Sequence, residues 1–281
     1  MSTFNGQKFV VEAISTVLNQ TYKNFSLIIL DDCSTDCTLE IVHNRFSVDP
    51  RVSIYKNKER MGMIYTWNKL IKLAKPETEY FAWLSDHDRV NPDWLEQLLT
   101  IYNTTENVSL VYAHTNAIDS KGKIIFNYSK FEYAADSNKI LDRIYTLLTK
   151  DILYGNMIYG LFNFKILKKI GGYHKVLLPD TLTVWLVLLQ GRICFNSSAS
   201  WSRRYYDKYS LQRQKQSLGI PLNTIQVLLY PVTNAVYLYK KSMDQVFITR
   251  ILATFCYLIS VGKKQFVRSC SAYLKQILSQ N

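Results

Sequence analysis

The chain of 281 residues has few of the residues that mark disulfide-rich, disordered or membrane-spanning proteins. Its five cysteines are scattered without a CxxC pair or a histidine cluster, which argues against a zinc site or a disulfide framework and favours a reducing compartment. Prolines number only six, whereas 48% of the residues are hydrophobic, so a disordered chain is excluded. The longest uncharged apolar stretch, residues 251–261, is too short to span a bilayer, and we expect no signal peptide.

Acidic residues are scarce in the second half of the chain. Residues 1–140 hold 15 Lys and Arg against 17 Asp and Glu, whereas residues 141–281 hold 19 against 5. A basic half suggests an anionic partner such as a membrane surface, a phosphorylated substrate or nucleic acid, although a solvated basic surface explains it nearly as well. The chain also lacks a GxGxxG segment after a strand, a GxxxxGK[ST] segment and any helix-turn-helix, zinc-finger or RNP signature. These absences argue against a dehydrogenase and a P-loop ATPase and make nucleic-acid binding a minor alternative.

The first third of the chain alternates helical and strand patterns, as in a parallel α/β sheet. Apolar residues recur at helical spacing over residues 7–19, and residues 25–30 (FSLIIL) are a short apolar run typical of a strand buried on both faces. The same criteria predict helices at 39–46, 63–73 and 92–102, and strands at 52–55, 80–84 and 108–113. Asn91 and Pro92 are expected to cap and begin the last of these helices.

Two acidic clusters follow predicted strands. Asp31 and Asp32 close the strand at 25–30, and Asp86 and Asp88 follow the strand at 80–84. Because ligands of open α/β sheets bind outside the carboxyl ends of the strands, we expect one shared site. Each cluster alone could simply cap a helix, but like charges brought together are costly unless a cation or a donor-rich ligand offsets them. The second cluster offers the oxygen ligands that Mg²⁺ or Mn²⁺ prefers, so the two clusters predict a nucleotide–metal site.

Several short segments in order resemble family 2 glycosyltransferases over residues 1 to about 206. They are residues 2–6, 16–22 (TVLNQTY), 30–36 (LDDCSTD), 57–68 and 84–88 (LSDHD), followed by 159–162 and 170–173 on the family's acceptor side. The resemblance implies an α/β GT-A fold, which is Rossmann-like, with a mostly parallel sheet flanked by helices. It also implies sugar transfer with inversion from a nucleotide-sugar donor.

The resemblance assigns donor and metal roles to particular residues. The positions that match the residues holding the base and ribose are Thr3, Asn5, Asp31 and Asp32. Asp86 and Asp88 match the DxD motif, in which a divalent cation, Mn²⁺ or Mg²⁺, bridges to the donor diphosphate; Asp88 is favoured as the direct metal ligand and Asp86 would also contact the donor. The cation would neutralise charge on the leaving nucleoside diphosphate. His87 occupies the variable middle position of the motif and receives no role.

An inverting transferase also needs a general base beside the acceptor hydroxyl. Asp180 precedes an apolar helical run to residue 189 and resembles the family's base-bearing position, although the Glu that often precedes it is absent and capping of that helix is the alternative. Arg203 and Arg204 follow Trp201 and could contact the diphosphate or an anionic acceptor. Equally, they could be surface cations beside a core tryptophan.

The two ends of the chain carry further expectations. Residues 1–6 are expected to form the loop after a first strand that is missing, which would leave neighbouring strands with unpaired backbone groups. We expect a GT-A domain over 1–215, divided into a nucleotide-sugar-binding half (1–113) and an acceptor-side half (114–215), and a basic amphipathic helical extension over 216–281. The extension would either lie on an anionic membrane surface or pack on the catalytic domain or a second subunit.

The sequence thus predicts an inverting, metal-assisted glycosyltransferase. The donor would be a UDP-, dTDP- or GDP-sugar and the acceptor a glycan or lipid-linked glycan, in cell-surface polysaccharide synthesis. The expected location is the cytoplasm, with peripheral contact to the inner face of the membrane and no nucleic acid as partner. Two alternatives stay open: a truncated, non-catalytic nucleotide-sugar-binding protein, and a basic nucleic-acid-binding protein. The donor sugar, the acceptor and the oligomeric state are not determined.

Overall fold

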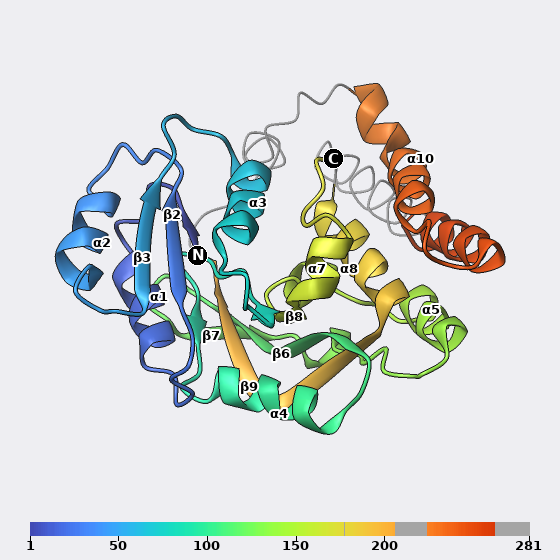
Figure 1. The fold of residues 1–281 in the computed structure, drawn as a ribbon, viewed down its shortest axis with the longest axis horizontal. Helices are drawn as coiled ribbons and strands as arrows, with labels where there is room; N and C mark the ends of the chain where they lie inside the picture. Colours follow the sequence, from blue (N-terminus) through green and yellow to red (C-terminus); the bar gives the residue numbers. More distant parts are fainter. Residues whose placement is uncertain (177, 206–223, 262–281) are drawn as a thin grey trace, which may run out of the picture.

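The computed structural model describes residues 1–176, 178–205 and 224–261, and its centre is formed by two β-sheets with helices packed around them (Figure 1). The first sheet is parallel, with the order β1-β2-β3. Its strands are β1 (Ser2–Thr3), β2 (Leu27–Asp31) and β3 (Val52–Lys56), and its helices are α1 (Val10–Leu18), α2 (Thr38–Phe46) and α3 (Met63–Leu73). The expected alternation of strands and helices in this part of the chain is confirmed.

The second sheet is mixed, with the order β4-β8-β6-β9-β5 and β7 paired to β6. Its strands are β4 (Tyr80–Phe81), β5 (Arg89–Val90), β6 (Val108–Ile118), β7 (Ile124–Asn127), β8 (Leu161–Asn163) and β9 (Arg192–Arg204). Only β6 and β9 run parallel, because a long crossover joins them, whereas the turn at 119–123 between β6 and β7 is short enough only for an antiparallel pair. Among the named strands, the parallel arrangement is therefore confined to β1–β3 and to the β6–β9 pair.

Helices cover the second sheet. They are α4 (Trp94–Thr104), η1 (Ser129–Phe131), α5 (Ile140–Thr149), α6 (Tyr154–Met157), α7 (Phe164–Lys169), α8 (Pro179–Gln190) and α10 (Thr224–Lys241), followed by a helical stretch at 247–261. Nearly every residue of α8 is buried, as expected for a helix that is apolar all round, and it contacts α5, α6, α7 and α10. Helix α8 is thus the centre of the larger hydrophobic core.

The start of the chain corrects one expectation. Residues 2–3, expected to belong to the loop after a missing strand, form β1, in which Ser2 pairs with Leu30 and Thr3 with Asp31. The backbone N–H groups of Leu30 and Asp32 donate to the carbonyls of Met1 and Thr3, at 3.0 and 2.8 Å. The edge of β2 is therefore satisfied along this short strand.

Two further boundaries differ from the sequence expectation. Helix α4 begins at Trp94 with Asp93 as N-cap, because Asn91 and Pro92 form a turn in which Trp94 N donates to Asn91 O at 3.0 Å. That turn is held by Gln20, whose Nε2 donates to Asn91 O at 2.6 Å. The strand expected at 80–84 ends at residue 81, because its partner β8 is only three residues long.

The C-terminal helices pack onto the larger hydrophobic core through one face. Ala235, Leu238, Ala253, Tyr257 and Val261 are buried in the same hydrophobic cluster as α8. Packing on the catalytic domain, one of the two expected roles of the extension, is thus confirmed for this face. The boundary expected near residue 215, and residues 262–281, lie outside the described residues. Within the described ranges, no helix combines the length and apolarity needed to cross a bilayer.

Candidate functional site

Asn5 joins the loop after β1 to the loop after β2, and Asp31 orders the second of these loops. Asp31 is fully buried, and its carboxylate accepts hydrogen bonds from the hydroxyl of Ser34 and, at 3.0 Å, from the Ser34 N–H. Asn5 lies at φ 52°, a left-handed conformation that Asn tolerates, and its Oδ1 accepts from Thr35 N at 2.9 Å. The two loops therefore form one rim, in which Asn5 is exposed and Asp31 is not.

Asp32 fixes the start of α3. Its carboxylate accepts from Asn57 Nδ2 at 2.7 Å, from Met61 N at 2.9 Å and from Gly62 N at 2.8 Å. Gly62 has φ 83°, a conformation that favours glycine, and it is the N-cap of α3. The ribose contact predicted for Asp31 and Asp32 stays a prediction. In the structure, both carboxylates accept hydrogen bonds from other groups of the protein.

Asp86 is directed toward the loop after β1. Its Oδ2 accepts from Thr3 Oγ1 at 2.6 Å and from Phe4 N at 3.3 Å, and its Oδ1 lies 2.8 Å from His87 Nδ1. A Cβ atom at Gly6 would overlap Asp86 Oδ2 and lie 2.8 Å from Thr3 Oγ1. Only glycine fits beside this carboxylate, so Thr3 and Asp86, predicted separately from the sequence, are in direct contact.

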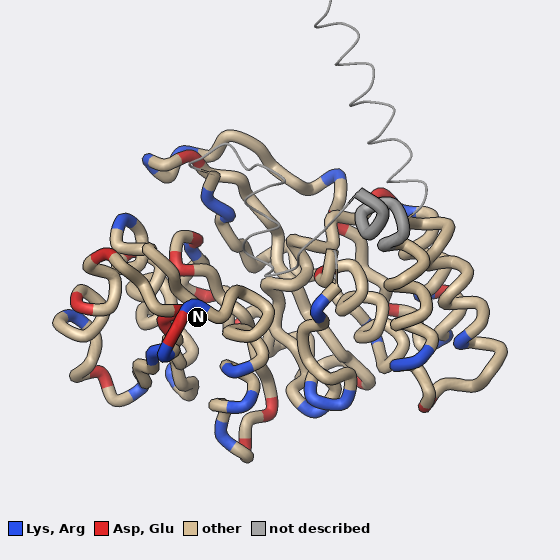
Figure 2. The backbone as a smooth tube through the Cα atoms, turned by 90° about the horizontal axis from the view of Figure 1, so that it is seen from above, with Lys and Arg blue, Asp and Glu red and all other residues tan. Residues whose placement is uncertain are grey.

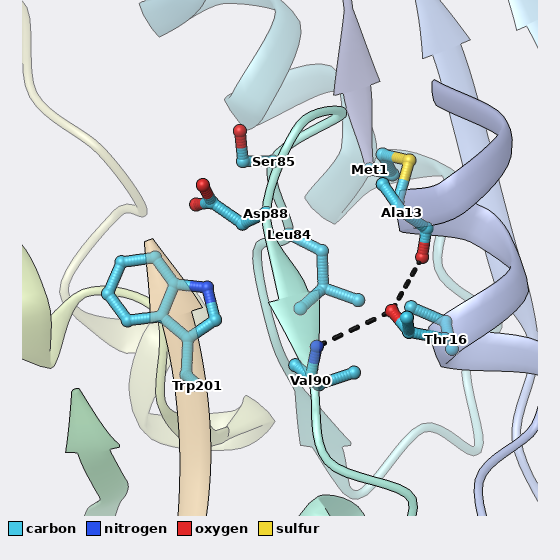
Figure 3. Close-up of a pocket in the computed structure, with 9 residues that line it drawn as sticks. Met1, Ala13, Thr16, Leu84, Ser85, Asp88, Val90 and Trp201 are labelled. Carbon is cyan, nitrogen blue, oxygen red and sulfur yellow. Dashed lines mark hydrogen bonds between the residues drawn. The ribbon is translucent and has the colours of Figure 1, made fainter. Parts of the chain in front are cut away.

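Asp88 lies beside Trp201 of β9 and near Ser85 (Figure 3). It is 6% exposed, and its Oδ1 accepts from the backbone N of Arg204 at 2.8 Å. Burial raises the pKa of Asp88, against the opposing charge of His87 and the hydrogen bond from Arg204. The hollow under Asp88 that Figure 3 shows has a volume of only about 10 Å³, room for a single water molecule at most.

His87, to which the sequence assigned no role, bridges the two acidic residues. Its Nδ1 lies 2.8 Å from Asp86 Oδ1 and its Nε2 lies 3.7 Å from Asp88 Oδ1. Burial acts to lower the pKa of His87, but the hydrogen bond to Asp86 and the charges of Asp88 and Asp86 outweigh it, so the pKa is raised. The only sequence signal for this role is the position of His87 between the aspartates.

Arg204 is held by groups of the protein itself. It is 4% exposed, which rules out a surface cation, and its guanidinium donates to the carbonyls of His87 (2.8 Å), Asp119 (3.2 Å) and Ser120 (3.1 Å). It also forms an ion pair with Glu12 of α1. The geometry disfavours diphosphate contact by Arg204, because each guanidinium nitrogen has a partner within the protein.

Arg203 and Asp180 lie together on the other side of Asp88. A Cβ at Gly155 would lie 3.0 Å from Asp180 Oδ2 and 3.7 Å from Arg203 Nη1, so both side chains border this glycine. Burial acts to lower the pKa of Arg203, and the surrounding groups, Asp88 and Asp180 among them, outweigh it and raise the pKa. Its Nη1 donates to Asn156 Oδ1 at 3.2 Å. Arg203 is therefore within electrostatic range of the carboxylate predicted to bind metal and of the carboxylate predicted to act as base, and its side chain donates a hydrogen bond to Asn156.

Asp180 lies in the first turn of α8 but does not cap it, since the N-cap is Leu178 at φ 51°. Its Oδ1 accepts a hydrogen bond from the hydroxyl of Tyr173. Burial raises the pKa of Asp180 to about 6, against the opposing charge of Arg203. A carboxylate with a pKa near the working pH is suited to accept a proton.

The residues present fit a divalent cation only if a ligand completes its shell. Within the described part of the chain, no group of three or more His, Cys, Asp or Glu is arranged to hold a metal. Asp86 and Asp88 provide two carboxylates, and Mg²⁺ and similar ions are commonly held by one or two carboxylates together with substrate phosphates and water. The donor set therefore suits a cation that arrives with a diphosphate.

The family follows from comparison with known sequences. Residues 1–171 match the sequence model of glycosyl transferase family 2, and the chain belongs to this family. Chondroitin synthase of Escherichia coli is 30% identical over 124 residues, which are 44% of this chain and 18% of that protein. Among the eight curated relatives compared, the chain spans at most 53% of a relative's length.

Solved structures share the fold. S. aureus TarS 1–349 in complex with UDP-GlcNAc has a TM-score of 0.67 at 16% identity and covers 92% of this chain and 70% of its own. The mannosyltransferase PcManGT from Pyrobaculum calidifontis, in complex with GDP-Man and Mn²⁺, has a TM-score of 0.56 at 14% identity and covers 92% and 68%. These likenesses establish the GT-A fold with C-terminal helices.

Proposed function

We propose that this chain transfers a sugar, with inversion and with the help of a divalent cation, from a nucleotide diphosphate donor to a hydroxyl of a glycan or lipid-linked glycan. The observation that carries the proposal is that Arg203 borders Gly155 together with Asp180 and lies within electrostatic range of Asp88. One arginine is therefore near both predicted chemical centres, one at the end of the loop before β5 and the other at the start of α8. Family membership and the nucleotide-sugar complexes of TarS and PcManGT support the donor class.

Each side chain then has a distinct task. Asp180 accepts the proton of the acceptor hydroxyl, whose oxygen attacks the anomeric carbon opposite the departing nucleoside diphosphate. Arg203 offers a guanidinium to negatively charged groups of the substrates that bind near Asp88 and Asp180. Asp86 and Asp88 would hold Mn²⁺ or Mg²⁺, which when bound supplies positive charge to the diphosphate. The rim that contains Thr3, with Asn5, Asp31 and Asp32, would receive the base and ribose.

A ligand screen tests donor and metal use. A ligand that binds only the folded state raises its stability, so we expect one of the UDP-, dTDP- and GDP-sugars to raise the melting temperature, and more so with Mn²⁺. Asp88→Asn should remove the Mn²⁺-dependent part of the shift, while Asp136→Asn, an exposed acid outside the site, should not. An undiminished Mn²⁺ response in Asp88→Asn would contradict the metal assignment. Donor binding without transfer to any acceptor would favour the non-catalytic binder instead.

We also propose a peripheral contact with the inner face of the cytoplasmic membrane, through the outer face of the C-terminal helices. Seven large apolar residues there are between 39% and 72% exposed: Met243, Val246, Phe247, Ile248, Ile251, Leu252 and Phe255. Figure 1 shows these helices at the edge of the molecule farthest from β3, and exposed Lys240 and Lys241 precede the apolar face. A basic, apolar helix face of this kind binds anionic lipid surfaces. At this surface the protein would meet the lipid-linked acceptors of polysaccharide synthesis.

Vesicle binding tests the membrane contact. The chain should co-sediment with phosphatidylglycerol vesicles and less with phosphatidylcholine vesicles. The double variant Phe247→Ser and Phe255→Ser should lose most of this binding. The matched control is Ile125→Ser and Phe126→Ser, which removes apolar residues of similar exposure on β7. Equal loss in both double variants would argue against a contact specific to the C-terminal helices.

A further inference from the structure

A second cavity lies between α3 and α7, which face each other in Figure 1. Its volume is about 510 Å³, sufficient for two or three sugar units or for several phosphate groups. One wall is the last two turns of α3 and the residues after it; the other is α7 and the turn that follows it. The lining residues are Asn68, Ile71, Lys72, Ala74, Lys75, Pro76, Phe164, Lys168, Gly171 and Gly172. We call this cavity the α3–α7 groove.

The charged residues that line the groove are all lysines. Lys72, Lys75 and Lys168 line it without any Asp or Glu, and each is exposed. Lys241 places a fourth ammonium group near the groove. A Cβ atom at Gly171, which lines the groove, would lie 3.7 Å from Lys241 Nζ. Glu77 and Glu79 follow on the next loop but do not line the groove. Figure 2 colours all basic and acidic residues on the backbone, and by sequence the second half of the chain is poor in acidic residues.

The lysines are not neutralised within the described residues. Lys72 and Lys75 have no side-chain hydrogen bond or ion pair there, and Lys168 lies over the ring of Phe164 at 4.5 Å. A lysine in the last turn of a helix offsets the helix dipole, which accounts for Lys72 and Lys168 singly. It does not account for Lys75, which lies beyond α3, nor for three ammonium groups around one cavity. Like charges around a cleft raise its free energy and concentrate anions within it.

The inner end of the groove is connected to the predicted base. Asn68 accepts from Tyr173 N at 2.8 Å and donates to Tyr173 O at 2.7 Å, which fixes that backbone against α3. Gly172 has φ 73°, and a Cβ there would lie 2.5 Å from Asn68 Oδ1, so the groove wall requires glycine. The hydroxyl of the same Tyr173 donates to Asp180. The groove wall is therefore linked to the group that would activate the acceptor through Tyr173, whose side chain is buried between them.

We propose that the α3–α7 groove binds an anionic stretch of the acceptor glycan, through phosphate or carboxylate groups that pair with Lys72, Lys75 and Lys168. The inference rests on the proposed function, which it deepens by naming the acceptor as an anionic polymer. A neutral glycan could accept hydrogen bonds from the three ammonium groups but carries no charge to offset theirs. An anionic glycan offsets their mutual repulsion.

Binding of labelled oligosaccharides tests the proposal without knowledge of the natural acceptor. The probes are fluorescein-labelled oligogalacturonate, a glycerol phosphate oligomer of equal length, and a neutral galacto-oligosaccharide, measured by anisotropy. We expect at least one anionic probe to bind more tightly than the neutral one, and Lys72→Gln, Lys75→Gln and Lys168→Gln together to raise its Kd at least tenfold. The carboxylate and phosphate arms identify the anion. The control changes Lys121, Lys123 and Lys139, exposed lysines outside the groove, to Gln and should leave the Kd unchanged.

Several outcomes would overturn the proposal. Equal weakening in the groove variant and the control variant would indicate non-specific attraction, and no weakening in the groove variant would remove the site. Loss of binding to phosphatidylglycerol vesicles in the groove variant, without any oligosaccharide binding, would assign the lysines to a lipid headgroup. The melting-temperature shift with nucleotide sugar is measured on the same variant and should be unchanged. A wild-type chain that binds the anionic probe but no nucleotide sugar would contradict the proposed transfer while leaving the groove intact.

Discussion

Arg203 and Arg204 are neighbours in sequence with opposite roles. Arg204 is directed into the protein, toward three carbonyls and Glu12, whereas Arg203 is directed toward Asn156 and borders Gly155 together with Asp180. Adjacent residues of a strand point to opposite faces of the sheet, so the pair could not share one task. At the scale of single residues, the chemistry of the site depends on these directions.

The predicted base is open to a direct test. Asp180→Asn removes the proton acceptor while keeping the size of the side chain, so transfer should fall by about 10²- to 10⁴-fold with donor binding retained. Initial rates with a saturating donor, together with the melting-temperature shift it causes, measure the two effects separately. Asp136→Asn serves as the control. Unchanged transfer in Asp180→Asn would mean that another group is the base.

The pKa of Asp180 also predicts a pH dependence. Because burial raises it from 3.8 to about 6, Asp180 is protonated below pH 6 and the transfer rate should fall as the pH drops through that value. The raised pKa means that Asp180 favours folding fully only below about pH 4 and loses this contribution as the pH rises through 6. Asp180→Asn should therefore gain stability relative to the wild type between pH 6 and 8 and not at pH 4. Melting curves of the wild type and the variant at pH 4, 6 and 8 measure this. The same difference in melting temperature at every pH would be evidence against the raised pKa of Asp180.

At the scale of elements, the loop after β1 and the loop before β5 act as one unit. Thr3, Phe4 and Gly6 surround Asp86, and Arg204 at the end of β9 holds His87 and Asp88. The predicted donor side of the site is thus assembled from three segments that are far apart in the sequence. Changes in one segment should disturb the carboxylates in another.

Gly6→Ala tests the first of these contacts. The added Cβ would overlap Asp86 Oδ2, and since Gly6 does not have a left-handed φ, the backbone itself tolerates alanine. We expect a weaker Mn²⁺-dependent response to nucleotide sugar with little change in the melting temperature of the free protein. Gly155→Ala, which borders Asp180 instead, should spare the donor response and reduce transfer. If Gly6→Ala and the wild type gave the same response to nucleotide sugar, the observed position of Asp86 would not be required for donor binding.

Arg204→Gln tests the second contact. It removes a buried guanidinium that satisfies three carbonyls, so we expect a loss of about 1–3 kcal/mol in the free energy of unfolding and a higher KM for the donor. Glu12→Gln should cost less, because the side chain of Glu12 is 41% exposed and partly solvated. Urea denaturation and steady-state kinetics provide the comparison. An Arg204 variant with reduced kcat and an unchanged donor KM would point to direct contact with the reacting groups.

At the scale of the whole molecule, the C-terminal helices belong to the catalytic core on one face and are exposed and apolar on the other. Leu238 is fully buried with α8, so Leu238→Ala should lower the free energy of unfolding by about 2–5 kcal/mol. Val236, two residues away and 47% exposed, is the control, since its change to Ala should cost little. Urea denaturation measures both. Equal, small losses would mean that α10 adds little to the stability of the core.

Much of the fold was predictable from local patterns. The helix at 63–73 and the strand after Phe25 appear almost as predicted, because apolar periodicity and strand propensity act over a few residues. The boundaries at Asn91 and at residues 82–84 were wrong, because Gln20 and the short β8 determine them from far along the chain. Local signals cannot report such contacts.

The sequence by itself determined that carboxylates follow β2 and β4 and that a single acid, Asp180, begins an apolar helix, since these facts depend only on order and spacing. Only the tertiary structure decided that His87 bridges Asp86 and Asp88, that Arg204 is structural, and that three lysines line one groove. Because side chains alternate along β9, Arg203 and Arg204 must point to opposite faces of the sheet. The register of β9 against β6 determined which of the two arginines points to which face. Burial by distant residues likewise sets the pKa of Asp180, because desolvation depends on everything that packs around a charge.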